Sequence, residues 1–333
     1  MISTDVFVIG AGLAGLTLAQ QLKRQGKQVV CVDKARGSGG RLSSKRVQDN
    51  QHTVSFDLGA SSFSASSHDF HRVVEQWCEQ GCLASWLKQN DVMQYVGTPR
   101  SSSMTRLLAD DVGVQFGVRV TAIVKHESGW SIFVEQGNQN VLFADAKEVV
   151  LASPAPQSYA LIPDEHELKP LLKDVNIFPQ WVVMLAVQNP LDIANLSEAP
   201  NVNIARVSYE NSKPGRDNTH GLHVYCVQAS QQWSEKRLDY SKDKVTYELA
   251  DELSQLCEEP LNIKLDYAHR WLYSNGSDFS HDTEGFLSCD DGLSLCGDYL
   301  LSNTDVDGVE AAYLSGYALA MHMNKSNVKR TLG

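Results

Sequence analysis

The chain has 333 residues, enough for one large or two ordinary domains, and a formal net charge of −11 at pH 7. Acids spread along the chain argue against a protein built to hold nucleic acid or an anionic membrane. The seven cysteines form no CxxC pair, and no apolar run approaches the roughly 20 residues that cross a bilayer. We therefore expect a soluble cytoplasmic protein with no disulfide framework and no bound metal.

The first predicted element is a buried strand that leads into a glycine turn and a helix. Residues 5–9, DVFVI, are a nearly continuous apolar run of the kind found in parallel sheets. GAGLAG follows at GxGxxG spacing, and LTLAQQLKRQ shows helical periodicity until Gly26. Gly10 allows the tight turn, Gly12 lets backbone approach a diphosphate, and Gly15 lets helix and strand pack closely. This order predicts a dinucleotide site.

The second predicted strand, QVVCVD, ends in Asp33, about 20 residues beyond the first glycine, as in dinucleotide-binding folds. A carboxylate there accepts hydrogen bonds from ribose hydroxyls and disfavours a 2′-phosphate. The alternative is that Asp33 only ends a strand. Next come Gly37, Gly39 and Gly40, which free backbone amides to approach a second part of a diphosphate. Arg41 adds a guanidinium suited to a bidentate contact.

The middle of the chain alternates between helical and strand patterns. Residues 62–98 are helix-rich, with apolar side chains on one side of FHRVVEQWCEQGCLASWL. Residues 117–143 alternate between apolar and polar positions with turns, which predicts a small antiparallel meander. Residues 148–156, EVVLASPAP, predict a separate buried strand. Residues 157–283 combine strand-like runs with a helix near 241–257, so we expect a mixed sheet plus helices.

The C-terminal segment supplies a second strand-to-helix unit. LSLCGDYL, residues 293–300, is a short apolar strand ending in Gly297 and Asp298. After a polar loop, VDGVEAAYLSGYALAMHM begins a helix. The N-terminus of that helix can stabilise negative charge.

The glycine turn, the acid that ends the second strand, the GGR loop and the GD segment together resemble the flavin-containing amine oxidase superfamily. The resemblance implies FAD, with its pyrimidine edge at the N-terminus of the last helix and its adenine beside the strand that contains Val120. The cofactor-binding residues that it implies are Gly10, Ala11, Gly12, Ala14, Gly15, Asp33, Lys34, Gly39, Gly40, Arg41, Val120, Gly297, Asp298, Gly308, Val309 and Glu310.

The fold class that follows is α/β with an amine-oxidase-like architecture. A Rossmann-like FAD/NAD(P)-binding domain, discontinuous and carrying the antiparallel meander, would be joined to a mixed α+β substrate domain. The FAD-binding domain is expected to comprise residues 1–61, 99–156 and 284–333. The substrate domain is expected to comprise residues 62–98 and 157–283.

Longer phrases resemble the bacterial renalase-like oxidoreductases and recur in family order: DKARGSGGRLSSKR, DLGASSF, YVGTPRSSSMTRLLA, SPAPQ, NSKPGR, AHRWLYS and CGDYLLSNTDVDGVEAAYLSG. This resemblance implies a noncovalent FAD oxidase that takes hydride from 2-dihydro- and 6-dihydro-NAD(P) isomers. It would regenerate NAD(P)+ and reduce molecular oxygen to hydrogen peroxide. The alternatives are a flavin amine oxidase acting on a small amine and a non-catalytic flavin- or NAD-binding regulatory protein.

The sequence offers no certain catalytic residue, and the proposed chemistry needs none. A dihydropyridine alkylated on nitrogen becomes aromatic by losing hydride alone, so the protein must stack and orient the ring. Arg206, Lys213 and Arg216 either meet a substrate diphosphate or belong to an ordinary charged turn. The candidates for the pocket walls are Trp271, which could instead be a core residue, Tyr95, Tyr225, Asp57, Gly59 and Ala60.

Three residues depart from the renalase-like pattern. Gln228 stands where relatives often have histidine, Tyr95 replaces a frequent tryptophan, and Cys296 replaces a frequent alanine. Cys296 is also outside the tail position that superfamily members use to attach flavin covalently, so a dissociable cofactor is expected.

Overall fold

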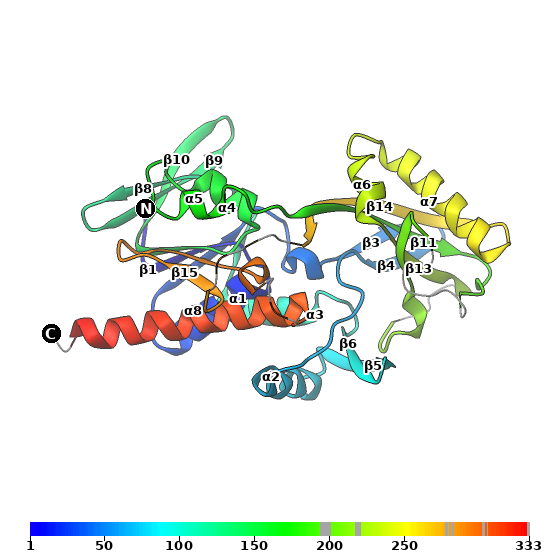
Figure 1. Cartoon of the computed structure of the whole chain (residues 1–333), viewed down its shortest axis with the longest axis horizontal. Helices are drawn as coiled ribbons and strands as arrows, with labels where there is room; N and C mark the ends of the chain where they lie inside the picture. Colours follow the sequence, from blue (N-terminus) through cyan, green and yellow to red (C-terminus); the bar gives the residue numbers. More distant parts are fainter. Residues whose placement is uncertain are drawn as a thin grey trace.

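The computed structural model describes residues 1–193, 201–216, 221–276, 279, 281, 283–301, 304 and 306–331. Its largest sheet has eight strands and lies on the left of Figure 1. The strand order is β15-β16-β10-β1-β2-β7, and β8 and β9 continue from β10 as an antiparallel meander. The strands are β1 (Ile2–Ile9), β2 (Val29–Asp33), β7 (Gln115–Phe116), β8 (Val120–His126), β9 (Gly129–Gln136), β10 (Gln139–Leu151), β15 (Phe286–Ser288) and β16 (Leu293–Cys296).

Both faces of this sheet are buried, as the apolar run in β1 predicts. β1 pairs in parallel with β2 and β10, and β10 pairs in parallel with β16. Val6 and Val8 join one hydrophobic cluster, whereas Phe7 and Ile9 join the cluster on the opposite face. The first cluster includes residues of α1 (Leu13–Arg24), α2 (His68–Glu79), α3 (Ser103–Val112) and α8 (Gly308–Thr331). The second includes residues of α4 (Ala155–Leu161) and α5 (Lys169–Leu172).

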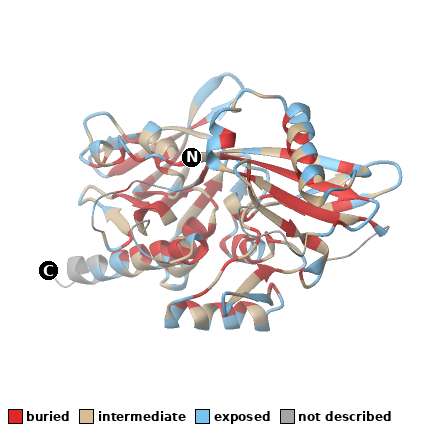
Figure 2. Cartoon of the chain, turned by 45° about the vertical axis from the view of Figure 1, so that its right-hand side comes forward, coloured by how far each residue is buried: buried red, intermediate tan, exposed pale blue. Residues whose placement is uncertain are grey.

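A four-stranded antiparallel sheet forms the other main layer, on the right of Figure 1. One face packs against α6 (Gln231–Glu235) and α7 (Lys242–Cys257), and the other packs against the ribbon of β3 and β4. Figure 2 shows the buried residues concentrated along its strands. The strands, in spatial order, are β12 (Ile204–Tyr209), β13 (His223–Ala229), β11 (Phe178–Val187) and β14 (Ile263–Asn275), and the ribbon is β3 (Ser44–Gln48) and β4 (Thr53–Asp57).

A hairpin of β5 (Leu83–Gln89) and β6 (Val92–Gly97) lies beside α2, and short 3-10 turns occur at η1 (Gly40–Leu42), η2 (Glu210–Ser212) and η4 (Asp298–Leu301). Within the described residues, no helix has both the length and the apolar character that a membrane span requires.

The α/β class with a Rossmann-like nucleotide domain is confirmed, while two details of the sequence prediction are wrong. The second sheet is antiparallel throughout, not mixed, because apolar alternation does not report strand direction. The runs near 141 and 148 belong to one strand, β10, because Ala144 and Ala146 are buried and continue the alternation through the residues between them.

The two-domain division stays a prediction, and the packing crosses its boundaries at two places. Val54, Phe56 and Leu58, assigned to the FAD-binding domain, pack against the antiparallel sheet. Residues 162–177, assigned to the substrate domain, pack against the large sheet.

Candidate functional site

The glycine turn after β1 adopts the shape that the sequence predicts, and each glycine has a distinct reason to be glycine. Gly10 has φ +116°, and a Cβ atom there would lie 2.6 Å from the carbonyl oxygen of Ala152. A Cβ at Gly15 would lie 2.1 Å from the carbonyl oxygen of Gly10. At Gly12 a Cβ would meet nothing within 4 Å, and this residue begins α1 without a side-chain cap. The open side of Gly12 therefore lies where backbone amides point out of a helix N-terminus.

Asp33 lies at the carboxyl end of β2 and faces the same turn. Its carboxylate accepts hydrogen bonds from the backbone N–H of Ala11 and of Ala35, each at 2.7 Å. A carboxylate has room for about four donors, so acceptor sites are left for ribose hydroxyls. The neighbouring Lys34 donates to Gln157 at 3.0 Å and is exposed.

The second glycine loop lies directly against the first. Gly39 has φ +127° and donates its N–H to the carbonyl oxygen of Ala11 at 3.4 Å. A Cβ at Gly40 would lie 3.6 Å from the Cα of Gly12. The two segments that the sequence assigns to one diphosphate thus meet in space.

Arg41 joins this loop to the C-terminal segment. Its guanidinium makes a bidentate contact with Asp298, at 2.7 and 2.5 Å, and also donates to the carbonyl oxygen of Ser274 at 3.0 Å. Arg41 and Asp298 are 257 residues apart in sequence, so this pair fixes how the two ends of the nucleotide domain face each other.

The N-terminus of α8 lies beside this pair, because a Cβ at Gly308 would be 3.9 Å from a carboxylate oxygen of Asp298. The backbone N–H of Val309 already donates to Asp307, at 2.9 Å. Glu310 is buried and accepts from the backbone N–H groups of Ser66 and Ser67 at 2.7 and 2.8 Å, so it anchors the 66–67 loop.

The remaining predicted cofactor residues occupy the same edge of the large sheet. Ala14 is buried in α1, and a Cβ at Gly316 would lie 2.1 Å from its carbonyl oxygen, so α1 and α8 pack closely. Gly297 donates its N–H to Ser315 of α8 at 2.7 Å. Val120 begins β8, shortly after Val118 donates its N–H to the carbonyl oxygen of Asp33 at 2.9 Å.

These observations together fit an extended dinucleotide. The open side of Gly12, the spare acceptor sites of Asp33 and the uncapped start of α1 are the parts that a diphosphate and a ribose require.

The DLGA loop, residues 57–60, is hydrogen-bonded to the turn that contains Arg41. Leu58 donates its N–H to Ser43 at 3.0 Å, and Ala60 donates its N–H to the carbonyl oxygen of Arg41 at 2.9 Å. A Cβ at Gly59 would lie 1.7 Å from that same oxygen. Glycine is therefore required at 59 for the loop to approach the predicted cofactor segment.

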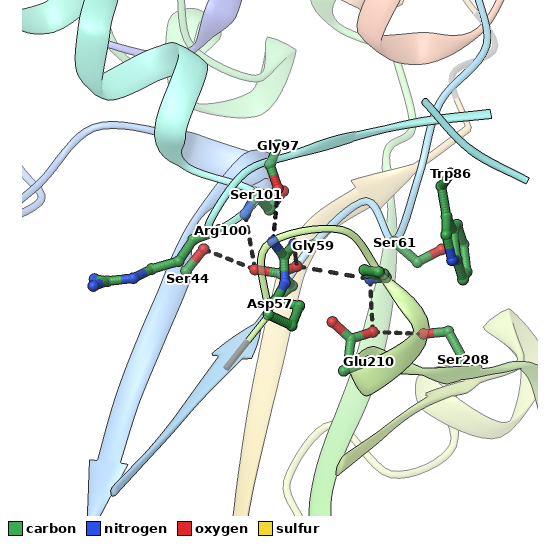
Figure 3. Close-up of polar contacts among 12 residues, drawn as sticks. Ser44, Asp57, Gly59, Ser61, Trp86, Gly97, Arg100, Ser101, Ser208 and Glu210 are labelled. Carbon is green, nitrogen blue, oxygen red and sulfur yellow. Dashed lines mark hydrogen bonds and ion pairs between the residues drawn. The ribbon is translucent and has the colours of Figure 1, made fainter. Parts of the chain in front are cut away.

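A buried charge cluster of Asp57, Glu210, Lys213 and Arg216 holds this loop against the antiparallel sheet (Figure 3). Asp57 is 2.5 Å from Arg216 and 3.7 Å from Lys213, and Lys213 is 2.6 Å from Glu210. The backbone N–H of Ser101 also donates to Asp57 at 2.9 Å. Since each charge faces an opposite charge, the cluster is neutral as a whole.

The titration behaviour of the two acids in this cluster differs. Burial would raise the pKa of the Asp57 carboxyl, but Lys213 and Arg216 hold it below its usual range. Burial raises the pKa of Glu210, and the opposing effect of Lys213 only partly offsets it. Asp57 is therefore the firmly ionised member of the pair.

This cluster bears on the two readings that the sequence leaves open for Lys213 and Arg216. Lys213 is buried between Asp57 and Glu210, and the guanidinium of Arg216 is paired with Asp57, so both cations are already engaged within the protein, which favours the reading as a structural charged turn. Arg206 donates to the hydroxyl of Ser61 at 2.9 Å. The sequence alone does not predict this cluster, because its members come from segments that meet only in the folded chain.

A small pocket lies beside this loop. Tyr95 is one of its walls, and its ring centroid is 6.1 Å from that of Phe63, which sequence reasoning missed. Asp57 and Ala60 also line it, whereas Gly59 is not among the lining residues. The lining residues are Leu42, Asp57, Ala60, Ser61, Ser62, Phe63, Tyr95, Val96, Gly97, Ser101 and Arg216.

The other two aromatic candidates lie apart from this pocket. Trp271 is half-buried and donates its indole N–H to the carbonyl oxygen of Leu58 at 2.8 Å, so it supports the loop from the sheet side. Tyr225 is a correction. Its side chain is on the helix-covered face of the sheet, 1% exposed, and its hydroxyl accepts from the N–H of Leu191 at 2.8 Å, so it is a core residue.

Gln228, one of the departures from the renalase-like pattern, donates to the carbonyl oxygen of Gly59 at 3.0 Å.

No group of three or more His, Cys, Asp or Glu side chains that could hold a metal ion occurs among the residues the structure describes.

Comparison with known families identifies two matching regions. Residues 8–79 match the family model described as NAD(P)-binding Rossmann-like domain, and residues 71–324 match the model described as flavin containing amine oxidoreductase.

Curated relatives align over short parts of the chain. A 4-hydroxybenzoate brominase (decarboxylating) of Pseudoalteromonas luteoviolacea is 28% identical over 27% of this chain and 18% of its own length. Protein anon-37Cs of Drosophila lebanonensis is 34% identical over 29% of this chain and 17% of its own length. The matched region is thus less than a fifth of either relative.

Solved structures align over nearly the whole chain. A putative protoporphyrinogen oxidase from Exiguobacterium sp. 255-15 superposes with a TM-score of 0.74 at 11% identity, covering 98% of this chain and 100% of the other. Wild-type putrescine oxidase bound to putrescine gives a TM-score of 0.64 at 12% identity, covering 97% and 99%. At these identities the likeness establishes the fold.

Proposed function

The chain belongs to the flavin-containing amine oxidoreductase family, and from this premise we propose that it is an FAD-dependent oxidase of dihydronicotinamide dinucleotides. It takes hydride from 2-dihydro- and 6-dihydro-NAD(P) isomers, returns NAD(P)+ and uses molecular oxygen as the acceptor that becomes hydrogen peroxide. FAD is the cofactor, and when bound it supplies the hydride acceptor.

The observation that carries the proposal is the charge of the pocket wall. Asp57 is the single acid among the lining residues that the structure describes, and two cations already neutralise it. An alkylammonium substrate would find no free carboxylate there, whereas a neutral dihydropyridine needs none. The half-buried ring of Tyr95 offers flat apolar surface, and Ser61 and Ser62 offer hydroxyls to an amide.

The residues around the pocket then have defined tasks. Arg41, Gly59 and Ala60 fix the loop beside the predicted cofactor segment through the contacts to the Arg41 carbonyl. Tyr95, with Phe63 packed behind it, stacks on and orients the ring, and Trp271 supports the loop through Leu58. No group has to remove a proton from carbon, because hydride loss alone makes the ring aromatic.

The cofactor is proposed to be held without a covalent bond. Cys296 is fully buried, and burial raises the pKa of its thiol to about 12, so its nucleophilic thiolate form is scarce. All seven cysteines are free in the structure, which supports the reducing cytoplasm as the compartment.

The test mixes the oxidised holoenzyme, without oxygen, with 2-dihydro-, 6-dihydro- and ordinary 4-dihydro-NAD, and separately with putrescine and benzylamine. We expect fast loss of the flavin's visible absorbance with the 2- and 6-dihydro isomers and slow or no loss with the others. Admission of oxygen should then release hydrogen peroxide in an amount equal to the NAD+ formed. Fast bleaching by an amine, with none by the 2- and 6-dihydro isomers, would assign the protein to amine oxidation instead.

A further inference from the structure

A dinucleotide substrate carries a diphosphate, and the cations that the sequence suggests for it are already in use. Lys213 and Arg216 belong to the buried charge cluster, and Arg206 contacts Ser61. Any cationic contact to the substrate must then come from other residues near the pocket, in a chain whose net charge is −11.

Arg46, Arg100 and Arg106, here called the arginine cluster, meet this requirement where β3 contacts the start of α3. Ser44 of β3 accepts the backbone N–H of Ser102 at 3.2 Å, and Arg46, two residues along the strand, projects from the same face. Arg100 lies directly before Ser101 of the pocket wall. In Figure 3 the side chain of Arg100 points away from the buried charge cluster.

Arg106 belongs to the first turn of α3 and completes the group. Its N–H donates to the carbonyl oxygen of Ser102 at 2.9 Å. Ser103, three residues earlier on the same face of the helix, accepts the backbone N–H of Arg100 at 3.2 Å. The three guanidinium groups therefore gather at one junction from three separate positions in the chain.

These guanidinium groups have no internal partner within the described residues. Among the described residues, none of the three makes a side-chain hydrogen bond, an ion pair or a ring contact. Arg46 and Arg106 are exposed, and Arg100 is half-buried. Burial lowers the pKa of Arg100, and repulsion from Arg46 and Arg106 lowers it further. An acidic chain that holds three cations in mutual repulsion gains from a multiply charged anion that relieves it.

We propose that the arginine cluster binds the diphosphate of the dinucleotide substrate while its dihydronicotinamide ring lies against Tyr95. This inference rests on the proposed function and names the part of the substrate that gives specificity for a dinucleotide over a simple dihydropyridine. Planar guanidinium groups suit diphosphate oxygens through paired N–H donors.

The first experiment measures equilibrium binding of ADP to the FAD-loaded protein by calorimetry, so that its readout is independent of turnover. We expect Arg100→Ala and the double variant Arg46→Ala/Arg106→Ala each to weaken ADP binding by roughly tenfold or more. Arg24→Ala, which removes one exposed charge from the end of α1, is the matched control and should not weaken it. Equal ADP affinity in the wild type and in both cluster variants would overturn the assignment.

The second experiment compares kcat/KM for a dihydro-NAD isomer with kcat/KM for the corresponding 1-methyl-dihydronicotinamide, which lacks the diphosphate. The wild type should prefer the dinucleotide, and this preference should fall roughly tenfold in Arg100→Ala through a higher KM for the dinucleotide. An unchanged preference overturns the inference. Inorganic phosphate that binds as tightly as ADP also overturns it, since the cluster would then be a general anion site.

The two experiments separate the inference from the function on which it rests. If no dihydro isomer reduces the flavin, the proposed function fails, while ADP binding still decides whether the arginine cluster recognises a nucleoside diphosphate.

Discussion

At the scale of single residues, glycines that look alike in the sequence have different tasks. Gly15 is confined by protein backbone, because a Cβ there would meet the Gly10 carbonyl at 2.1 Å, whereas Gly12 has open space and φ −74°. The free space at Gly12 is where we place the cofactor diphosphate.

Gly12→Ala should therefore separate cofactor binding from folding. We expect the unfolding free energy of the apoprotein to change by no more than about 0.5 kcal/mol, since the new methyl group clashes with nothing. FAD affinity should fall roughly tenfold or more, since the methyl group enters the diphosphate space. Thermal melting of the apoprotein and titration with FAD measure the two effects. Gly15→Ala is the control, because it should lower the melting temperature itself; an unaltered FAD affinity in Gly12→Ala would contradict the placement.

His269 supplies a prediction about pH. Burial, and then the nearby Lys242, lower the pKa of His269 to about 4, and its ring lies 4.3 Å from that of Trp271. The folded protein thus keeps this imidazole neutral, while the unfolded chain takes up a proton below its ordinary pKa of 6.5. Stability contributed by the neutral ring is present above pH 6.5 and is lost as the pH falls from 6.5 towards 4.

His269→Gln should consequently show a flatter pH dependence than the wild type. Between about pH 7 and about pH 5 the wild type should lose more unfolding free energy in urea titrations than the variant does. Parallel curves for the two proteins would show that the pKa of His269 is not lowered in the folded state.

At the scale of elements, the buried charge cluster links β4 to the turn at η2. Its four members neutralise one another, so a single substitution leaves an unpaired charge in the interior. Arg216→Met should destabilise the protein by about 3–5 kcal/mol. Asp57→Asn/Arg216→Met keeps the Lys213–Glu210 pair and should cost less than the sum of its two single variants. A double-mutant cycle in urea measures this coupling; strictly additive costs would mean that the pair does not act as a unit.

The sequence identifies some of these elements and not others for clear physical reasons. The β1 turn, α1 and the acid of β2 are local patterns, since their geometry depends on neighbouring residues. The charge cluster depends on residues 57 and 210–216 meeting in space, which no local pattern reports. Tyr225 was misplaced for the same reason, because an aromatic residue in a strand does not reveal which face of the sheet is covered by helices.

At the scale of the whole molecule, one salt bridge joins segments from the two ends of the chain. Arg41 and Asp298 bring the second glycine loop beside the start of α8, and the close packing of Gly316 on Ala14 holds α8 against α1. The C-terminal part of the sequence is therefore needed to complete a site that the N-terminal part begins. The resemblance to known flavoproteins predicts this closure; the residues alone predict only its two halves.

This closure makes a prediction about Gly316. Gly316→Leu should force α8 away from the carbonyl oxygen of Ala14, since even a Cβ atom would be only 2.1 Å from it. We expect weaker FAD binding together with a lower melting temperature. Leu314→Ala, also on α8 but only partly buried against the core, is the comparison variant and should retain the cofactor better. Equal FAD content in the two variants would contradict a role for α8 in closing the site.

The measurement that tests the account most directly is the amount of FAD released when the purified protein is denatured. The account predicts a yellow protein that releases close to one FAD per chain, and a large loss of FAD from both Asp33→Ala and Arg41→Ala while the apoproteins still fold. A wild-type protein that is colourless and takes up no added FAD would contradict it.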